Sequence, residues 1–183
     1  MSAGPHKHPM PNYRRARVAG GTYFFTVVAR ERRPVLTGEA VRTALREAIA
    51  RVRATKPFRV DAWVLLPDHL HCLWTLPPGD ADFSSRWSAI KRLTSQAAAG
   101  SAGTESAQSG LWQERFWEHV VRDDPDFARH ADYIHWNPVR HGHAARAADW
   151  PYSTFRRYCE QGVYPDDWGG GSARAASGTA FGE

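Results

Sequence analysis

Histidine pairs of the form His-x-His are the first residues in this chain whose type and spacing could do chemistry. Three such pairs occur, at His6/His8, His69/His71 and His141/His143. Nine histidines in 183 residues would give roughly 0.4 such pairs by chance, so a pair alone is a weak signal. Only His69 and His71 lie in a strand-like segment, where residues i and i+2 project to one face. Two imidazoles held on a strand could bind a divalent metal ion, or could be ordinary strand histidines with hydrogen-bond partners.

A metal site needs further ligands, and a helix-like segment near the C-terminal third offers four candidates. Asp132, Tyr133, His135 and Asn137 are the polar residues of that segment. Tyr133 and Asn137 are four residues apart and therefore share a helix face. If this face covers the histidine pair, Asn137 can offer its carbonyl oxygen to the metal and Tyr133 can place a phenol beside it. The alternatives are a core tyrosine and an asparagine that ends the helix before Pro138.

The phenol of Tyr133 could act as a nucleophile in such a site. A tyrosine hydroxyl has a pKa near 10 and attacks poorly until a nearby cation stabilises the phenolate. Two histidines, one amide oxygen and water suit Mg²⁺ or Mn²⁺, and Zn²⁺ is not excluded. If the helix face covers the histidine pair, His69, His71 and Asn137 could hold such an ion, and the structural roles of these residues stay open.

The first half of the chain predicts one long helix between strands. Residues 22–29 are rich in aromatic and β-branched residues and read as a strand. From Thr37, a plausible cap, apolar residues recur at helical spacing, and this helix ends before Pro57. Residues 58–66 and 69–76 read as two strands of one hairpin, with the turn at Pro67 and Asp68.

The second half predicts two more helices around a short strand. A helix begins at Phe83 and runs to about Ala99, and residues 100–110 are expected to form a flexible loop. A strand covers residues 116–121, and a helix that opens at Asp124 and Pro125 ends at Asn137 because Pro138 follows. The order β-α-β-β-α-β-α predicts an α+β fold, a ferredoxin-like antiparallel sheet with helices packed on it.

The composition predicts one soluble domain with disordered segments at both termini. We expect a disordered arm over residues 1–12, a single domain over residues 13–168 and a disordered tail over residues 169–183. No run approaches the roughly 20 apolar residues of a membrane span, and the N-terminus lacks the apolar core of a secretory signal. Two cysteines make no disulfide framework, which favours a cytoplasmic location.

The charge points toward nucleic acid. The formal net charge is +5, and only three of the 24 basic residues are lysines. Arginine binds phosphate bidentately, although a preference for arginine codons would give the same composition. Tryptophans could stack on unpaired bases or simply fill the core. The candidate DNA-binding residues are Tyr13, Arg14, Arg15, Arg17, Lys91, Arg92, Arg140, His141, Arg156 and Arg157.

Two acidic residues beside histidines need a separate interpretation. Glu118 and His119 are adjacent on a predicted strand, so they face opposite ways and cannot both enter one site. We therefore expect Glu118 either to be structural or to support the site residues indirectly. Asp68 could orient an imidazole of the pair, but a role in the turn is favoured.

Several separated motifs resemble a known family. The segment from Val64 to Trp74, which contains His69-Leu70-His71, and the segment Asp132–Arg140 resemble the HUH endonucleases and, within them, the IS200-like Y1 transposases. The resemblance is narrower to the REP-associated tyrosine transposases, and it covers about residues 13–168. Further matches are residues 20–27, Trp112-Gln113 with residues 115–119, and residues 150–155.

The resemblance implies a metal-dependent enzyme that cleaves and rejoins single-stranded DNA beside hairpins such as REP-like palindromes. In that family a helix-borne tyrosine attacks the scissile phosphate, a 5′-phosphotyrosine link forms, and a 3′-hydroxyl leaves. These roles fall on Tyr133 as nucleophile, with His69, His71 and Asn137 as metal ligands. Many insertion-sequence relatives carry glutamine where this chain has Asn137, which is one methylene shorter.

Two other functions stay open from the residues. A non-catalytic protein that binds single strands or hairpins would need the arginines and aromatics but not Tyr133, and a hydrolase that activates water would form no protein–DNA adduct. The expected partner is single-stranded DNA with hairpins, without a membrane role. The expected location is the nucleoid in the cytoplasm, and the expected state is a monomer or a homodimer.

Overall fold

The computed structural model describes residues 16–102 and 110–169. The arm over residues 1–12, the candidate DNA-binding residues Tyr13, Arg14 and Arg15, and the tail beyond Gly169 lie outside the described residues. The predicted domain limits at residues 13 and 168 therefore stay predictions.

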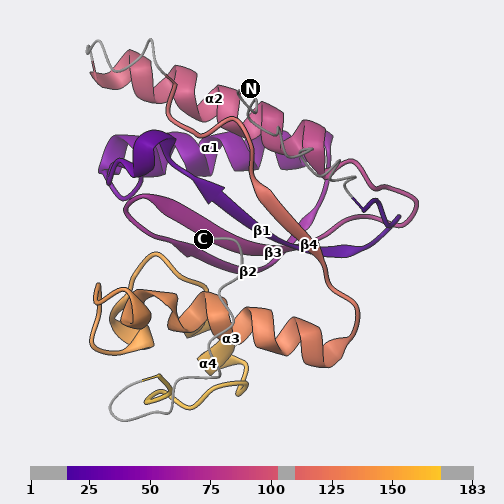
Figure 1. The fold of residues 1–183 in the computed structure, drawn as a ribbon, viewed down its shortest axis with the longest axis vertical. Coiled ribbons are helices and arrows are strands. Elements are labelled where there is room, and N and C mark those ends of the chain that lie inside the picture. Colours follow the sequence, from indigo (N-terminus) through magenta and orange to yellow (C-terminus); the bar gives the residue numbers. More distant parts are fainter. Residues whose placement is uncertain (1–15, 103–109, 170–183) are drawn as a thin grey trace, which may run out of the picture.

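A four-stranded antiparallel sheet forms the centre of the molecule (Figure 1). Its strands lie in the order β2-β3-β1-β4, which is the order of a ferredoxin-like fold. The sheet confirms the predicted α+β class, and all four strands were expected close to their observed positions. The strands are β1 (Thr22–Val28), β2 (Arg59–Leu65), β3 (His69–Thr75) and β4 (Trp117–Val120).

Helices cover both faces of the sheet. Figure 1 shows α1 and α2 side by side on one face and α3 with α4 on the other. Two short 3₁₀ turns, η1 and η3, connect these elements. The ranges are η1 (Arg30–Arg32), α1 (Glu39–Thr55), α2 (Phe83–Ala102), α3 (Asp124–Arg140), η3 (Ala147–Asp149) and α4 (Phe155–Glu160).

Alternation along the strands divides the core into two clusters. On β1, Tyr23 and Phe25 pack toward α1 and α2, whereas Phe24 packs toward α3. On β3, Leu70 and Cys72 join the first cluster, which leaves His69 and His71 on the face of α3. The sheet thus presents the histidine pair to the helix that carries Tyr133 and Asn137.

Two predicted helix limits were wrong. The cap of α1 is Gly38, which makes no side-chain cap bond, whereas Thr37 uses its backbone carbonyl to accept a hydrogen bond from Arg42. The second wrong limit is the end of α2. This helix runs to Ala102, so residues 100–102 are helical and were wrongly assigned to the loop. The remaining predicted loop residues, apart from Gly110, lie outside the described residues.

The predicted end of α3 at Asn137 was also wrong. The helix continues through Pro138 to Arg140. A proline removes one backbone donor and disfavours helical geometry in the residue before it, but it does not forbid a final turn. The chain then closes the helix with the backbone N–H of His141 bonded to the carbonyl of Asn137. The extra turn matters because it places Arg140 and His141 beside the histidine pair.

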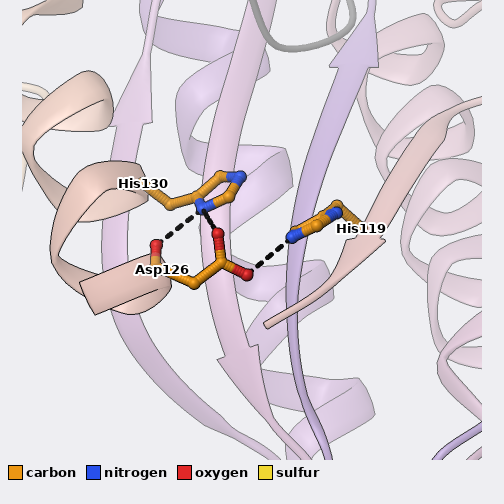
Figure 2. A group of neighbouring side chains, drawn as sticks. All are labelled: His119, Asp126 and His130. Carbon is orange, nitrogen blue, oxygen red and sulfur yellow. Dashed lines mark hydrogen bonds and ion pairs between the residues drawn. The ribbon is translucent and has the colours of Figure 1, made fainter. Parts of the chain in front are cut away.

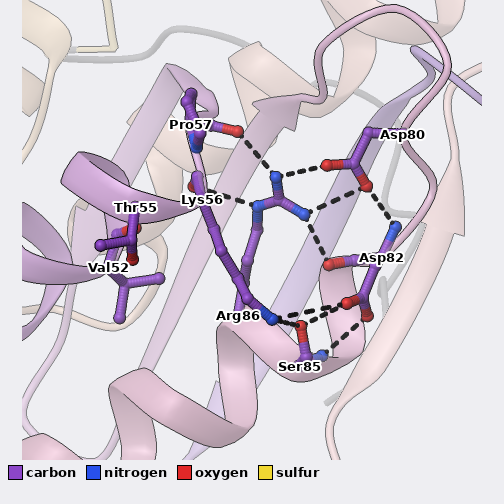
Figure 3. A network of polar contacts seen from close by, with 8 residues as sticks. All are labelled: Val52, Thr55, Lys56, Pro57, Asp80, Asp82, Ser85 and Arg86. Atoms are coloured by element: carbon purple, nitrogen blue, oxygen red, sulfur yellow. Dashed lines mark hydrogen bonds and ion pairs between the residues drawn. The ribbon is translucent and has the colours of Figure 1, made fainter.

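A buried arginine, Arg86, links α2 to the end of α1 through hydrogen bonds (Figure 3). The Arg86 guanidinium donates to the Asp80 carboxylate, with a shortest distance of 2.6 Å, and to the carbonyls of Asp82 and Pro57 at 2.7 and 2.9 Å. Its Nε also donates to the carbonyl of Lys56. These bonds connect the start of α2 with the end of α1 and with the turn that leaves β3. Among the described residues, no helix combines the length and the apolar character needed to cross a membrane.

Candidate active site

The histidine pair on β3 is buried beneath α3. His69 and His71 are 2% and 0% exposed, and their ring centroids lie 4.8 Å apart. Both imidazoles project to the same face of the sheet, as the alternation predicts. Cys72 points to the opposite core, so it takes no part in this cluster.

Each imidazole is held by a hydrogen bond at Nδ1. The Nδ1 atom of His69 lies 2.6 Å from the Asp68 carboxylate, and that of His71 lies 2.9 Å from the Thr26 hydroxyl on β1. Asp68 thus orients an imidazole, the role that sequence reasoning ranked second. Thr26 was not predicted, although it stands directly opposite His71 in the β1–β3 register.

The outer nitrogens of the pair have the chemistry of metal ligands. The Nε2 atoms of His69 and His71 are buried and have no hydrogen-bond partner among the described residues. Burial lowers the pKa of both imidazoles, and that of His71 lies well below its ordinary value of 6.5. Both rings are therefore neutral at pH 7 and can donate a lone pair.

One face of α3 brings three polar residues to the pair. Tyr133, Asn137 and His141 follow one another at four-residue intervals. The Tyr133 ring lies 5.1 Å from the His71 ring, and the His141 ring lies 5.3 Å from the His69 ring. Asn137 stands between Tyr133 and His141 on the same helix row.

Asn137 does not act as an ordinary helix cap, because its buried side chain makes no hydrogen bond to the backbone of the described residues. Its side chain is 0% exposed, and neither Oδ1 nor Nδ2 has a hydrogen-bond partner among the described residues. A buried amide without partners costs free energy, so this position needs a reason beyond the fold. Two imidazole nitrogens and one amide oxygen, all buried and without partners, form a donor set that fits a divalent cation.

The phenol of Tyr133 faces a cation from its own helix. Arg140 donates from Nη1 to the Tyr133 hydroxyl at 3.1 Å, and its guanidinium carbon lies 5.5 Å from the ring centroid. Tyr133 is half-buried, with the edge of Phe24 against its inner side. A guanidinium beside a phenol favours the phenolate, which is the nucleophilic form.

A second polar group, which sequence reasoning missed, lies one helical turn before Tyr133 (Figure 2). Asp126 and His130 on α3 meet His119 on β4, and one ligand atom from each lies within 4.8 Å of the others. The Asp126 carboxylate is 2.8 Å from Nε2 of His119, and the backbone carbonyl of Asp126 is 2.8 Å from Nδ1 of His130. The four-residue spacing of Asp126 and His130 was the available signal.

This second group could hold a metal ion, and it also fastens the start of α3 to the sheet. Asp126 has further partners in the backbone N–H of Arg122 and the guanidinium groups of Arg122 and Arg129. The His119 hydrogen bond heads the interactions that hold the pKa of Asp126 far below its ordinary value despite burial. Cations already surround this carboxylate, whereas the imidazoles of His69 and His71 offer open nitrogens. We therefore place the candidate metal centre at the β3 pair.

The remaining predicted DNA-binding residues are spread over the molecule. Arg140 and His141 lie at the candidate centre, whereas Lys91 and Arg92 lie within α2 on the opposite face of the sheet. Arg156 and Arg157 lie on α4, and Arg17 is exposed before β1. Lys91 donates to the backbone carbonyls of Gln113 and Glu114, a structural role.

The tryptophans mainly serve the core. Trp74 and Trp87 are fully buried and stack at 4.3 Å between ring centroids, and none of the eight is classed as exposed. Glu118 is also buried, and it points away from the face that carries His119. The prediction that Glu118 and His119 face opposite sides of the sheet is confirmed.

Comparison with known proteins gives consistent matches. The family model described as "Transposase IS200 like" matches residues 17–137. A REP-associated tyrosine transposase from Escherichia coli is 47% identical over 161 residues, which cover 88% of this chain and 92% of that protein. A relative from Haemophilus influenzae is 40% identical over 167 residues, and the match covers 88% of this chain and 94% of that protein.

A solved structure agrees with the fold. It is described as a REP-associated tyrosine transposase bound to a REP hairpin, and it superposes with a TM-score of 0.81 at 44% identity. The match covers 95% of this chain and 98% of that one.

Proposed function

Because this chain belongs to the IS200-like transposase family, among the REP-associated tyrosine transposases that nick and join DNA, we propose that it cuts single-stranded DNA beside hairpins through Tyr133. The substrate would be a REP-like palindrome with single-stranded flanks. The observation that supports the proposal most directly is that the Tyr133 ring lies beside the buried His71 ring, while His69, His71 and Asn137 keep buried polar atoms without hydrogen-bond partners among the described residues.

The chemical step is a transesterification. The Tyr133 hydroxyl oxygen attacks the scissile phosphorus, the bond to the 3′ oxygen breaks, and the 5′ phosphate stays on the tyrosine. The phenol gives up its proton, and the departing 3′ oxygen takes one. Because one phosphodiester replaces another, a second strand's 3′-hydroxyl can reverse the step and join the DNA.

The residues around Tyr133 have separate tasks. His69, His71 and Asn137 would hold Mg²⁺ or Mn²⁺, which supplies a Lewis acid to the scissile phosphate. Asp68 and Thr26 keep the two imidazoles in position through their Nδ1 atoms. Arg140 favours the phenolate and can then meet the charge of the phosphate.

The partner and its location follow from the same premise. A relative of similar structure is described with a REP hairpin bound, which supports a DNA hairpin as the partner of this chain. All four central residues come from one chain, which supports a site that is complete in a monomer. A DNA substrate of this kind places the protein at the nucleoid in the cytoplasm.

A denaturing gel tests the proposal. Wild-type protein, Mn²⁺ or Mg²⁺, and a labelled hairpin with single-stranded flanks should give a protein–DNA band that survives denaturation. Tyr133→Phe should bind the same DNA and form no such band, because only the hydroxyl is lost. Cleavage without an adduct would favour a hydrolase that uses water, and binding without cleavage would favour a non-catalytic hairpin-binding protein.

A further inference from the structure

A groove lies on the other side of the sheet, between α1 and the outer edge of β2. Its volume is about 470 Å³, the size of a site for a small organic ligand. Side chains of α1, of β2 and of residues 151–154 line it. His69 and His71 lie beneath α3, which carries Tyr133, so this groove is separate from the candidate active site.

The rim of the groove is positively charged. Arg42, Arg46 and Arg53 of α1 line it, and none of the described residues that line it is acidic. Arg42 and Arg53 are partly engaged, since each donates from Nε to a backbone carbonyl. Arg46 is exposed and makes no hydrogen bond or ion pair within the described residues. Its guanidinium is therefore available to an anionic partner.

The floor of the groove is apolar and partly aromatic. Leu45, Ile49 and Leu65 supply aliphatic surface, and Trp63 and Tyr152 supply rings. Arg42 already places its guanidinium 4.6 Å from the centre of the Tyr152 ring. Aromatic side chains beside arginines are what a single-stranded nucleic acid requires, because bases stack on rings while phosphates bind guanidinium groups.

The groove is built rigidly and connects to the catalytic helix. The backbone of Tyr152 accepts from the N–H of Leu65, and the N–H of Thr154 donates to the carbonyl of Trp63, so residues 152–154 extend the edge of β2. The hydroxyl of Thr154 also lies 2.9 Å from Nε2 of His135 on α3. Arg157 of α4 contacts the carbonyl of Val60, which lines the groove. Positive charge thus continues around the β2 edge from α4 to α1.

We propose that this groove binds an unpaired nucleotide of the DNA strand that flanks the hairpin. The base would pack against Trp63 and Tyr152, and the adjoining phosphates would meet Arg46 and Arg53. The inference rests on the proposed function, because it assumes that DNA is the substrate. It adds a subsite for the flank at a distance from the residues that cut it.

A matched pair of variants tests the subsite. Arg46→Ala removes the arginine on the rim, and Arg51→Ala removes an exposed arginine of the same helix that does not line the groove. Binding of a hairpin with ten-nucleotide flanks is measured by fluorescence anisotropy with divalent cations chelated, so that no strand is cut. Arg46→Ala should lose about tenfold in affinity, the loss of one charge-assisted contact, and Arg51→Ala should lose little.

Two further binding measurements test whether Arg46 contacts a phosphate of the flank. The slope of log affinity against log salt should fall by about 0.7 for Arg46→Ala, the value for one phosphate of a single strand. A hairpin without flanks should bind both variants and the wild type equally. Equal losses for Arg46→Ala and Arg51→Ala, or equal losses with and without flanks, would overturn the subsite.

Cross-linking identifies what enters the groove. Flanks that carry 5-iodouracil should cross-link on irradiation to Trp63 or Tyr152, as mapped by peptide mass spectrometry. Arg46-dependent binding of a decaglutamate peptide, without such cross-links, would assign the groove to an acidic peptide and overturn the proposal. If wild-type protein forms the Tyr133 adduct while Arg46 has no effect, only the subsite fails. If wild-type protein binds no hairpin DNA, the proposed function fails with it.

Discussion

The burial of Asn137 is explained better by a ligand-binding role than by a contribution to stability. Its amide is fully buried, yet neither polar atom has a hydrogen-bond partner among the described residues. The Nε2 atoms of His69 and His71 share this condition. A fold selected only for stability would replace such groups with apolar ones, so their presence supports a ligand-binding role.

Asn137→Leu tests this role. Leucine has a similar volume and no polar group, so the variant should keep or raise the melting temperature of the wild type. The same variant should lose the metal-dependent protein–DNA adduct, because the amide oxygen is gone. Calorimetry and the denaturing gel give the two readings. A variant that unfolds several degrees earlier, with adduct formation intact, would make Asn137 structural.

Sequence reasoning found two pairs of site residues that each lie within one element, but it missed the pair Asp126 and His130 on α3 and the residues that meet across elements. His69 with His71, and Tyr133 with Asn137, are set by strand and helix periodicity. Thr26 contacts a residue 45 positions away through the register of the sheet, and His119 contacts a residue seven positions away because the start of α3 lies against β4. A single sequence holds no direct signal for such pairings.

At the scale of elements, the agreement follows the strength of the local pattern. The strands were predicted because they are short runs rich in β-branched and aromatic residues, bounded by glycine and proline turns. The end of α3 was missed because Pro138 lies in the last turn, where the helix can bear the loss of one donor. That extra turn brings Arg140 to Tyr133 and His141 to His69.

The junction of α1 and α2 depends on Arg86 and Asp80 (Figure 3). Asp80→Asn should lower the free energy of unfolding at pH 7 by about 2 kcal/mol, because a buried guanidinium loses its charged acceptor. Chemical denaturation of both proteins gives this difference. Glu114→Gln, an exposed carboxylate elsewhere, serves as the control and should change little.

The effect of Asp80→Asn should depend on pH in a defined direction. The hydrogen bond from Arg86 holds the pKa of Asp80 below its ordinary value of 3.8. A carboxyl group of this kind stabilises the fold fully above that value and loses the contribution as the pH falls through its lower native pKa. The gap between wild type and Asp80→Asn should therefore narrow toward pH 3. A gap of equal size at pH 7 and pH 3 would show that charge is not the cause.

At the scale of the whole molecule, the sheet separates two tasks. On one face, the histidine pair lies beneath α3, which carries Tyr133. On the other face, the basic groove lies beside α1. A formal net charge of +5, mostly from arginine, supplies attraction for DNA over both. The class of fold and the basic character were predictable from the sequence, whereas the groove depends on packing between α1 and residues 151–154.

Binding of hairpin DNA should weaken steeply with salt. If about four phosphates are neutralised, affinity should fall about a hundredfold between 50 and 200 mM salt, because counterions released on binding cost more free energy at high concentration. Fluorescence anisotropy over that range measures the slope. An affinity that stays constant would show that phosphate contacts contribute little.

Identification of the atom that carries the DNA tests the central claim most directly. Cleavage after arginine releases a peptide of residues 130–140, in which Tyr133 is the only tyrosine. After reaction with flanked hairpin DNA and nuclease trimming, mass spectrometry should find a 5′-phosphonucleotide on Tyr133 of this peptide, only when a divalent cation was present. A nucleotide attached to another residue, or cut DNA with no modified peptide, would contradict the account.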